Sequence, residues 1–325
     1  THDAIFAATP DVDPIYGYDI ANVGIYGGNV TRTTIGCNEI FGCSLGVLLA
    51  ADDVPIFEAA FRNNDVHDNA NDGINITAGL GKVLKPSTSI DEAYVTFDGD
   101  TATGNGDDGF DINVGAIDTT LVTMKNVTST GNDDDGVDLY LEAYDGGVVL
   151  TVDPSTFSGN GDDGVQAYLG AQYAVLANFA GVTANDNGED GLDIETECGG
   201  IGRVLIGPDP SRMDLVTQAI GGDMPDVFED FLAASGPVDV SGNGDDGIDL
   251  WMGSSFLSFA GIFDVTANNN GDDGMYGSVL ANEVSALLMT PTETLMPLVG
   301  TGLDILDLLG LDLPVTMPTY NSYGP

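Results

Sequence analysis

Pairs of acidic side chains beside a glycine recur along this chain, and their type and spacing could do chemistry. The chain reads GNGDDGFDI at 104–112, GNGDDGV at 159–165 and GNGDDGIDL at 242–250. Aspartate is a ligand for hard cations such as Ca²⁺, and it is also a common turn residue. The same residues could therefore bind cations or form turns.

Aligning the chain on the glycine after each acidic pair shows seven copies of one unit. These glycines are Gly73, Gly109, Gly136, Gly164, Gly191, Gly247 and Gly274. The intervals are 36, 27, 28, 27, 56 and 27 residues, so the unit is about 27 residues long and the longest interval holds an insertion. An Asn stands four residues before every glycine, and we call this set the Asn column: Asn69, Asn105, Asn132, Asn160, Asn187, Asn243 and Asn270.

Three further columns follow from the same alignment. The first acidic column, two residues before the glycine, contains Asn71, Asp107, Asp134, Asp162, Glu189, Asp245 and Asp272. The second acidic column, directly before the glycine, contains Asp72, Asp108, Asp135, Asp163, Asp190, Asp246 and Asp273. The strand column, two residues after the glycine, contains Asn75, Asp111, Asp138, Gln166, Asp193 and Asp249.

Apolar residues flank the strand column, which is the period-two pattern of a β-strand with one buried face. Short strands in matching positions of a coil of about 27 residues predict a parallel β-helix, in which equivalent residues stack about 4.8 Å apart. Stacked Asn amides could then hydrogen-bond from coil to coil. The glycine would mark either a positive φ or a close backbone approach. The segment NEIFGCSL at 38–45 is expected to be a degenerate first copy of the repeat.

With an Asn shortly before a Gly-Ile pair, this repeat resembles the pectate-lyase-like right-handed parallel β-helix repeat family over roughly residues 38–280. The resemblance implies an all-β solenoid. It implies little about function, because the family includes lyases, hydrolases, tailspikes, adhesins and structural proteins.

Two regions depart from the repeat. Residues 197–237 contain SRMDLVTQAI and DMPDVFEDFLAA, whose capping residues predict a two-helix insertion that covers a flank of the solenoid or contacts a partner. Residues 281–325 are expected to form a helical cap, with amphipathic helix up to 313, and an extended tail. Residues 1–37 would be an N-terminal segment or cap that could contact a neighbouring subunit.

Stacked coils would place like charges side by side, so something must offset the repulsion between the stacked aspartates. Bound Ca²⁺ between the coils is one such factor, hydrogen bonds from turn N–H groups are a second, and adaptation to high salt is a third. The candidate metal ligands are Asp107, Asp108, Asp111, Asp134, Asp135, Asp138, Asp162, Asp163, Glu189, Asp190, Asp193, Asp245, Asp246, Asp249, Asp272 and Asp273.

The composition excludes several functions. The chain has 52 Asp and Glu against 7 Lys and Arg, a net charge of −45, which argues against nucleic acid and anionic membranes as partners. The sequence contains no run of 18 apolar residues, so it predicts no transmembrane helix. A chain that begins at Thr1 suggests a removed leader, and sequons at Asn29, Asn75 and Asn126 fit secretion. Cys37 and Cys43 could form a disulfide, leaving Cys198 unpaired.

The uniformity of the copies favours a structural role over catalysis, because an active site would stand out at one coil. We therefore expect a secreted, Ca²⁺-associated extracellular filament, sheath or surface scaffold that assembles head to tail. The alternative is a polysaccharide lyase, a glycoside hydrolase or a glycan-binding adhesin on the same fold. A lyase would need a basic residue, and the seven Lys and Arg are scattered. The sequence assigns no catalytic residue.

Overall fold

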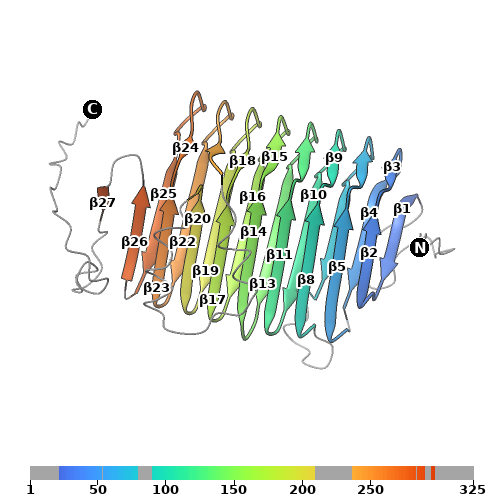
Figure 1. Ribbon diagram of the computed structural model, residues 1–325, viewed down its shortest axis with the longest axis horizontal. Helices are drawn as coiled ribbons and strands as arrows, with labels where there is room; N and C mark the ends of the chain where they lie inside the picture. The colour runs from blue at the N-terminus through green and yellow to red at the C-terminus, as the bar shows by residue number, and fades with distance from the viewer. Residues whose placement is uncertain are drawn as a thin grey trace.

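The computed structural model describes residues 22–52, 54–79, 90–208, 236–282, 284–289 and 294–296. In these ranges every regular element is a β-strand, and the strands stack as coils along one long axis, with the N-terminal coil at one end (Figure 1). None of the described elements is therefore a helix that could span a membrane. The coils contribute strands to three sheets, named A, B and C in the order in which the chain visits them.

Sheet A contains β1 (Val23–Gly28), β4 (Leu45–Ala51), β7 (Ile74–Ala78), β10 (Phe110–Ala116), β13 (Val137–Ala143), β16 (Val165–Ala171), β19 (Leu192–Cys198), β22 (Ile248–Ser254) and β25 (Tyr276–Ala281). Sheet B contains β2 (Arg32–Gly36), β5 (Ile56–Arg62), β8 (Glu92–Asp98), β11 (Thr119–Lys125), β14 (Gly147–Asp153), β17 (Ala174–Phe179), β20 (Ile201–Ile206), β23 (Leu257–Ile262), β26 (Val284–Met289) and β27 (Thr294–Met296). Sheet C contains β3 (Glu39–Phe41), β6 (Asp65–His67), β9 (Thr101–Thr103), β12 (Thr128–Thr130), β15 (Ser155–Ser158), β18 (Val182–Thr183), β21 (Val238–Asp239) and β24 (Val265–Thr266).

Neighbouring coils pair in parallel and stay in register. Val137 of β13 pairs with Phe110 on one side and with Val165 on the other, and the same step repeats along sheet A. Equivalent residues therefore lie on successive rungs, about 4.8 Å apart. This arrangement confirms the predicted parallel β-helix and its columns of like residues.

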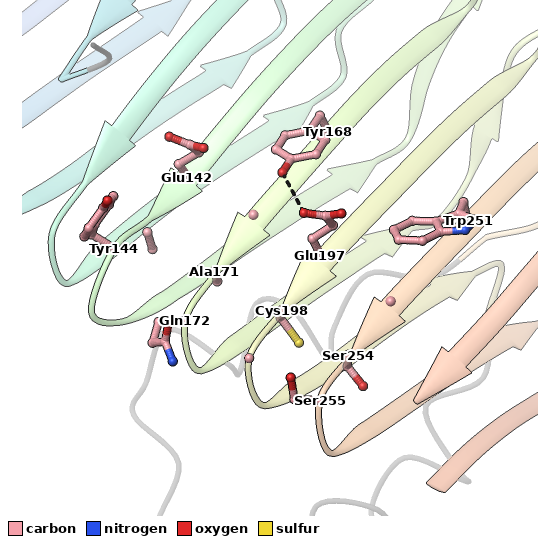
Figure 2. Close-up of a pocket in the computed structure, with 14 residues that line it drawn as sticks. Glu142, Tyr144, Tyr168, Ala171, Gln172, Glu197, Cys198, Trp251, Ser254 and Ser255 are labelled. Atoms are coloured by element: carbon pink, nitrogen blue, oxygen red, sulfur yellow. Dashed lines mark hydrogen bonds between the residues drawn. The ribbon is translucent and has the colours of Figure 1, made fainter. Parts of the chain in front are cut away.

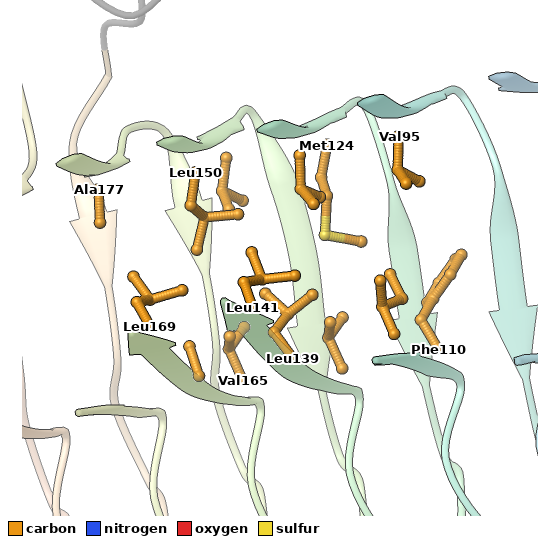
Figure 3. Packing of buried hydrophobic residues seen from close by; sticks show 14 of the residues in the cluster. Val95, Phe110, Met124, Leu139, Leu141, Leu150, Val165, Leu169 and Ala177 are labelled. Atoms are coloured by element: carbon orange, nitrogen blue, oxygen red, sulfur yellow. The ribbon is translucent and has the colours of Figure 1, made fainter. Parts of the chain in front are cut away.

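The core lies between the three sheets. Along β13, Val137, Leu139 and Leu141 are fully buried, whereas the residues between them face outward. Figure 3 shows how such side chains from opposite strands meet in the interior, where they form one continuous cluster. Near the N-terminal end, Phe97 stacks on Phe61 with a centroid distance of 4.8 Å, so aromatic rings of neighbouring coils pack on each other in the core.

The solenoid begins earlier than the sequence predicted. β1 and β2, which lie within the expected N-terminal segment 1–37, pair with β4 and β5 as an ordinary coil. This coil was missed because it lacks the acidic signature by which the repeat was recognised. Residues 1–21 lie outside the described residues.

The insertion begins later than predicted. Residues 201–206 were assigned to the two-helix insertion, but they form β20 and pair with β17 and β23. Five of the six residues of β20 are buried, so the strand lacks the alternation of a half-exposed strand. The helices themselves were predicted in segments that begin beyond residue 208, and residues 209–235 lie outside the described residues.

The C-terminal prediction of helix from 281 is wrong for its first part. Residues 284–289 form β26, which pairs with β23, and β27 then adds to β26 in antiparallel orientation. The open edge of sheet B supplies hydrogen-bond partners that outweigh a local helical pattern. Residues 297–325, including most of the expected cap and the tail, lie outside the described residues.

The degenerate first copy, residues 38–45, also has a different register from the one that the sequence predicted. Gly46 hydrogen-bonds to Asp72 of the next coil and aligns with Gly73, so Cys43 rather than Asn38 takes the place of the Asn column. The Cys37–Cys43 disulfide that the sequence left possible is absent, and both thiols are free, as is Cys198. The reason is topological: Cys37 precedes β3 at one corner of the coil and Cys43 follows it at the next.

Candidate functional site

In every coil after the first, the acidic columns gather at the corner where the chain passes from sheet C to sheet A. The corner opens with a residue in the left-handed conformation directly before the Asn column, for example Gly131 with a φ of 67°. The equivalent residues are Gly42, Asp68, Gly104, Gly159, Asp186, Gly242 and Asn269, all with positive φ. Only Gly, Asn and Asp occur here, as expected from the cost of this conformation for other side chains.

The Asn column forms a ladder inside the corner. Each Asn donates its Nδ2–H to Oδ1 of the Asn on the next coil, over 3.0–3.4 Å. The same Oδ1 accepts the backbone N–H of the preceding Asn, over 3.0–3.2 Å. The structure thus brings all seven members together, and all but Asn270 are buried.

The second acidic column forms a parallel ladder of a different kind. Oδ1 of each Asp accepts the backbone N–H of the equivalent Asp on the next coil, from Asp108 to Asp273, over 2.6–2.9 Å. This matches the turn hydrogen bonds considered from the sequence. It occupies one oxygen of each carboxylate and leaves Oδ2 directed elsewhere.

The partner of Oδ2 depends on the strand column. Where that column carries an amide, the amide donates: Asn75 Nδ2 to Asp72 Oδ2 at 2.8 Å, and Gln166 Nε2 to Asp163 Oδ2 at 3.4 Å. In four other units the amide is replaced by an acid that has no proton to donate when ionised: Asp111, Asp138, Asp193 and Asp249. In one of these units the two carboxylates, Asp108 and Asp111, have oxygens within 4.8 Å of each other and of Asp138, where the amide units have a hydrogen bond.

Four groups of three carboxylates at this corner have oxygens within 4.8 Å of one another: Asp72, Asp107 and Asp108; Asp108, Asp111 and Asp138; Asp134, Asp135 and Asp162; Asp245, Asp246 and Asp272. Each group spans two coils. Oxygen-only ligand sets of this kind suit Ca²⁺. Of the predicted ligands, the structure places Asp163, Glu189, Asp190, Asp193, Asp249 and Asp273 in the same columns but outside these groups.

Burial makes these carboxylates difficult to ionise together. Burial, reinforced by neighbouring carboxylates, raises the pKa of Asp108 to about 9 and that of Asp135 to about 8. The same causes raise the pKa of Asp111 to about 7 and that of Asp193 to about 6. None of the ion pairs among the described residues involves one of these aspartates. Protons or cations must therefore neutralise the corner.

Sequence reasoning missed two features of the polar corners. Asp72 joins a carboxylate group although its own unit carries Asn at the first acidic position. A second ladder runs along the corner between sheets B and C, where Asn38 donates to Asn64 and Asn64 donates to the fully buried Asp100. The spacing of 26 and 36 residues in this ladder matches the coil length and could have revealed it.

The comparisons with known proteins agree with this geometry. The family described as the right-handed β-helix region matches residues 18–199, which is more than half of the chain. No curated protein and no solved structure shows significant similarity to the chain.

Proposed function

The chain belongs to the right-handed β-helix family, and from that premise we propose that it is an extracellular structural protein whose coils are held together by Ca²⁺ along the acidic corner. The observation that carries the proposal is the set of four three-carboxylate groups along the corner, one of which includes the strand column. Asn75 and Gln166 each donate a hydrogen bond to the neighbouring carboxylate, whereas Asp111 and Asp138 present a second carboxylate at the same place. A divalent cation would bridge Asp108, Asp111 and Asp138, and the other three groups, one of which includes Asp72 of an amide unit, would bind cations through the first and second acidic columns.

Repetition supports a structural role. Three-carboxylate groups occur on several coils, from Asp72 to Asp272, so they do not set a single coil apart as a reaction centre along this corner. Partly buried three-carboxylate sites suit the weak affinities, about 10⁻⁴ to 10⁻³ M, of extracellular calcium modules. This fits a location outside the cell, where calcium is abundant enough to fill such sites.

The ends of the solenoid support self-assembly. In the described part of the chain, no strand lies beyond β25 in sheet A or beyond β24 in sheet C, while β27 covers the last parallel strand of sheet B. Nδ2 of Asn270, the final rung of the Asn ladder, is buried without a hydrogen-bond partner. Head-to-tail contacts of a second copy with the open strands β25 and β24 would produce filaments. Negative-stain microscopy should show fibres in Ca²⁺, and monomers alone under all conditions would exclude this assembly.

The calcium proposal is tested by thermal unfolding at fixed ionic strength, with Ca²⁺ or with EGTA. We expect Ca²⁺ to raise the Tm, because it binds the folded corner and not the unfolded chain. Asp138→Asn should lower the number of Ca²⁺ ions bound in equilibrium dialysis and reduce the Tm shift. The control is Asp145→Asn, an exposed carboxylate in the turn between sheets A and B, which should behave as wild type. Equal Tm values in Ca²⁺ and EGTA would rule out structural calcium.

A further inference from the structure

A groove on the outer face of sheet A has a character unlike the acidic corner. It crosses β13, β16, β19 and β22 near their carboxyl ends and encloses a cavity of about 580 Å³. Figure 2 shows Tyr168, Glu197 and Trp251 in succession along its length, with Glu142 at the N-terminal end. None of its lining residues is Lys, Arg or His.

Aromatic side chains form the floor of the groove. Tyr140 and Tyr168 occupy one outward column and stack with a centroid distance of 4.8 Å, and Trp251 occupies the same column two coils further on. Tyr168 and Trp251 are each followed two residues later by a glycine. A Cβ on Gly253 would lie 2.7 Å from the Trp251 ring, and one on Gly170 would lie 3.2 Å from the Tyr168 ring. The glycines thus leave room for these rings to lie over the strands, and both side chains remain partly exposed.

Carboxylates lie beside the rings and are oriented by them. The Tyr140 hydroxyl donates to Glu142 Oε1 at 2.9 Å, and the Tyr168 hydroxyl donates to Glu197 Oε2 at 3.3 Å. Burial and the hydrogen bond to Glu142 raise the pKa of Tyr140 to about 12, so the hydroxyl keeps its proton. Each glutamate therefore has a fixed position and further acceptor capacity for hydroxyl groups.

Exposed aromatic residues extend this surface at the turn between sheets A and B. Tyr144 is 53% exposed, Tyr173 is 61% exposed and Phe256 is 57% exposed, and all three lie beside the groove on nearby coils. Clustered, exposed aromatic residues are typical of binding surfaces.

We propose that this groove binds an uncharged polysaccharide chain lying along the solenoid axis. The ring faces would pack against the apolar faces of sugar rings, and Glu142 and Glu197 would accept hydrogen bonds from sugar hydroxyls. Glu195, which pairs with Tyr168 and Trp251 across the strands, adds further negative charge. Uronate and sulfated chains are therefore repelled.

Trp251 is the single tryptophan of the chain, so its fluorescence reports directly on the groove. The full chain in CaCl₂ is titrated with cellohexaose, xylohexaose and mannohexaose, and in parallel with hexagalacturonate. We expect a saturable change with at least one uncharged hexasaccharide and none with hexagalacturonate. Tyr168→Ala, which keeps the fluorescent Trp251, should weaken binding about tenfold or more. The matched control is Phe41→Ala, an exposed aromatic on sheet C, which should leave the Kd unchanged.

A second measurement does not depend on fluorescence. In affinity electrophoresis through gels that contain the polysaccharide corresponding to the responding sugar, wild type should be retarded and Trp251→Ala should not. Circular dichroism verifies that both variants are folded. The proposal is overturned if none of the three uncharged sugars changes the fluorescence, if hexagalacturonate binds equally well, or if Tyr168→Ala binds like wild type.

Discussion

At the scale of single residues, the Asn column and the second acidic column form different hydrogen bonds at the corner. Asn132 uses both ends of its amide, because Oδ1 accepts two hydrogen bonds from Asn105 while Nδ2 donates to Asn160. Asp135 uses one oxygen for a backbone N–H, and its carboxylate also lies within 4.8 Å of those of Asp134 and Asp162 in the first acidic column. Every Asn of the column from Asn69 to Asn243 therefore finds its acceptor within the protein, whereas the acidic ladder is completed only by a proton or a cation.

Asn132→Ala should be strongly destabilising. It leaves the backbone N–H and the side-chain amide of Asn105 without their acceptor in a buried site, where each unpaired donor costs about 1–3 kcal/mol. We expect a loss of about 2–4 kcal/mol in the free energy of unfolding, measured by urea titration. The neighbouring Asp133 is exposed, so Asp133→Ala should change stability by less than about 0.5 kcal/mol. Similar losses for both variants would contradict the ladder's role.

Stability without calcium should fall as the pH rises. An unfolded Asp titrates near pH 3.9, whereas burial raises the folded pKa of Asp193 to about 6, that of Asp111 to about 7 and that of Asp108 to about 9. The folded protein thus holds protons that the unfolded chain has lost, so the stabilisation is complete below pH 4 and disappears as the pH passes through the folded values. In EGTA, we expect the Tm to be lower at pH 8.5 than at pH 5.5.

Calcium should reverse this trend, because it binds the ionised carboxylates and competes with the protons. The Tm shift caused by Ca²⁺ should therefore be larger at pH 8.5 than at pH 5.5. A Tm in EGTA that stays constant or rises over this interval would show that the aspartates are not held in a desolvated, mutually repelling cluster.

At the scale of elements, the corner glycine allows close approach between coils. Gly136 does not have a positive φ, but a Cβ there would lie 2.5 Å from the Gly164 carbonyl oxygen and 2.7 Å from Asn160 Nδ2. The positive φ occurs instead at Gly131, five residues earlier, where a Cβ would meet no atom within 4 Å. Of the two explanations that the sequence left open for the repeated glycine, close approach is correct.

Gly136→Ala should therefore disturb the stacking of two coils. Backbone atoms cannot move away as a flexible side chain can, and overpacking of this kind costs about 1–3 kcal/mol. The comparison is Gly131→Asn, since the chain itself places Asn269 at the equivalent left-handed position. This second variant should lose less than about 1 kcal/mol in urea unfolding. The reverse order of stabilities would mean that the conformation, and not the contact, selects glycine in the repeat.

At the scale of the whole molecule, the solenoid is nearly one-dimensional, because each coil contacts mainly the coils on either side. The pairing of β13 with β10 and β16 illustrates this, and no described strand pairs with more than two others. The register places Val165 on the same column as Val137, 28 residues earlier. Deletion of one whole coil should therefore let the coils on either side of it pair in the same register.

Deletion of residues 137–164 should leave a folded protein. It joins Gly136 to Val165 and keeps every column in line, so far-UV circular dichroism should retain the β signal and unfolding should stay cooperative. Deletion of residues 137–150 removes only half a coil and puts the later columns out of register, so this shorter deletion should aggregate or unfold. Equal behaviour of the two deletions would contradict a register-based fold.

The sequence alone determined the coil length, the columns and the parallel β-helix, because the Asn, the acidic pair and the glycine lie within five residues of one another and recur with the period of the fold. It could not locate β20 or β26, because a strand buried on both faces or recruited by a sheet edge carries no alternating signal. The tertiary structure decided which oxygen of each aspartate is occupied, and it alone assembled Tyr168, Glu197 and Trp251 into a groove. These residues are 29 to 83 positions apart, and only the stacking of coils in register makes them neighbours.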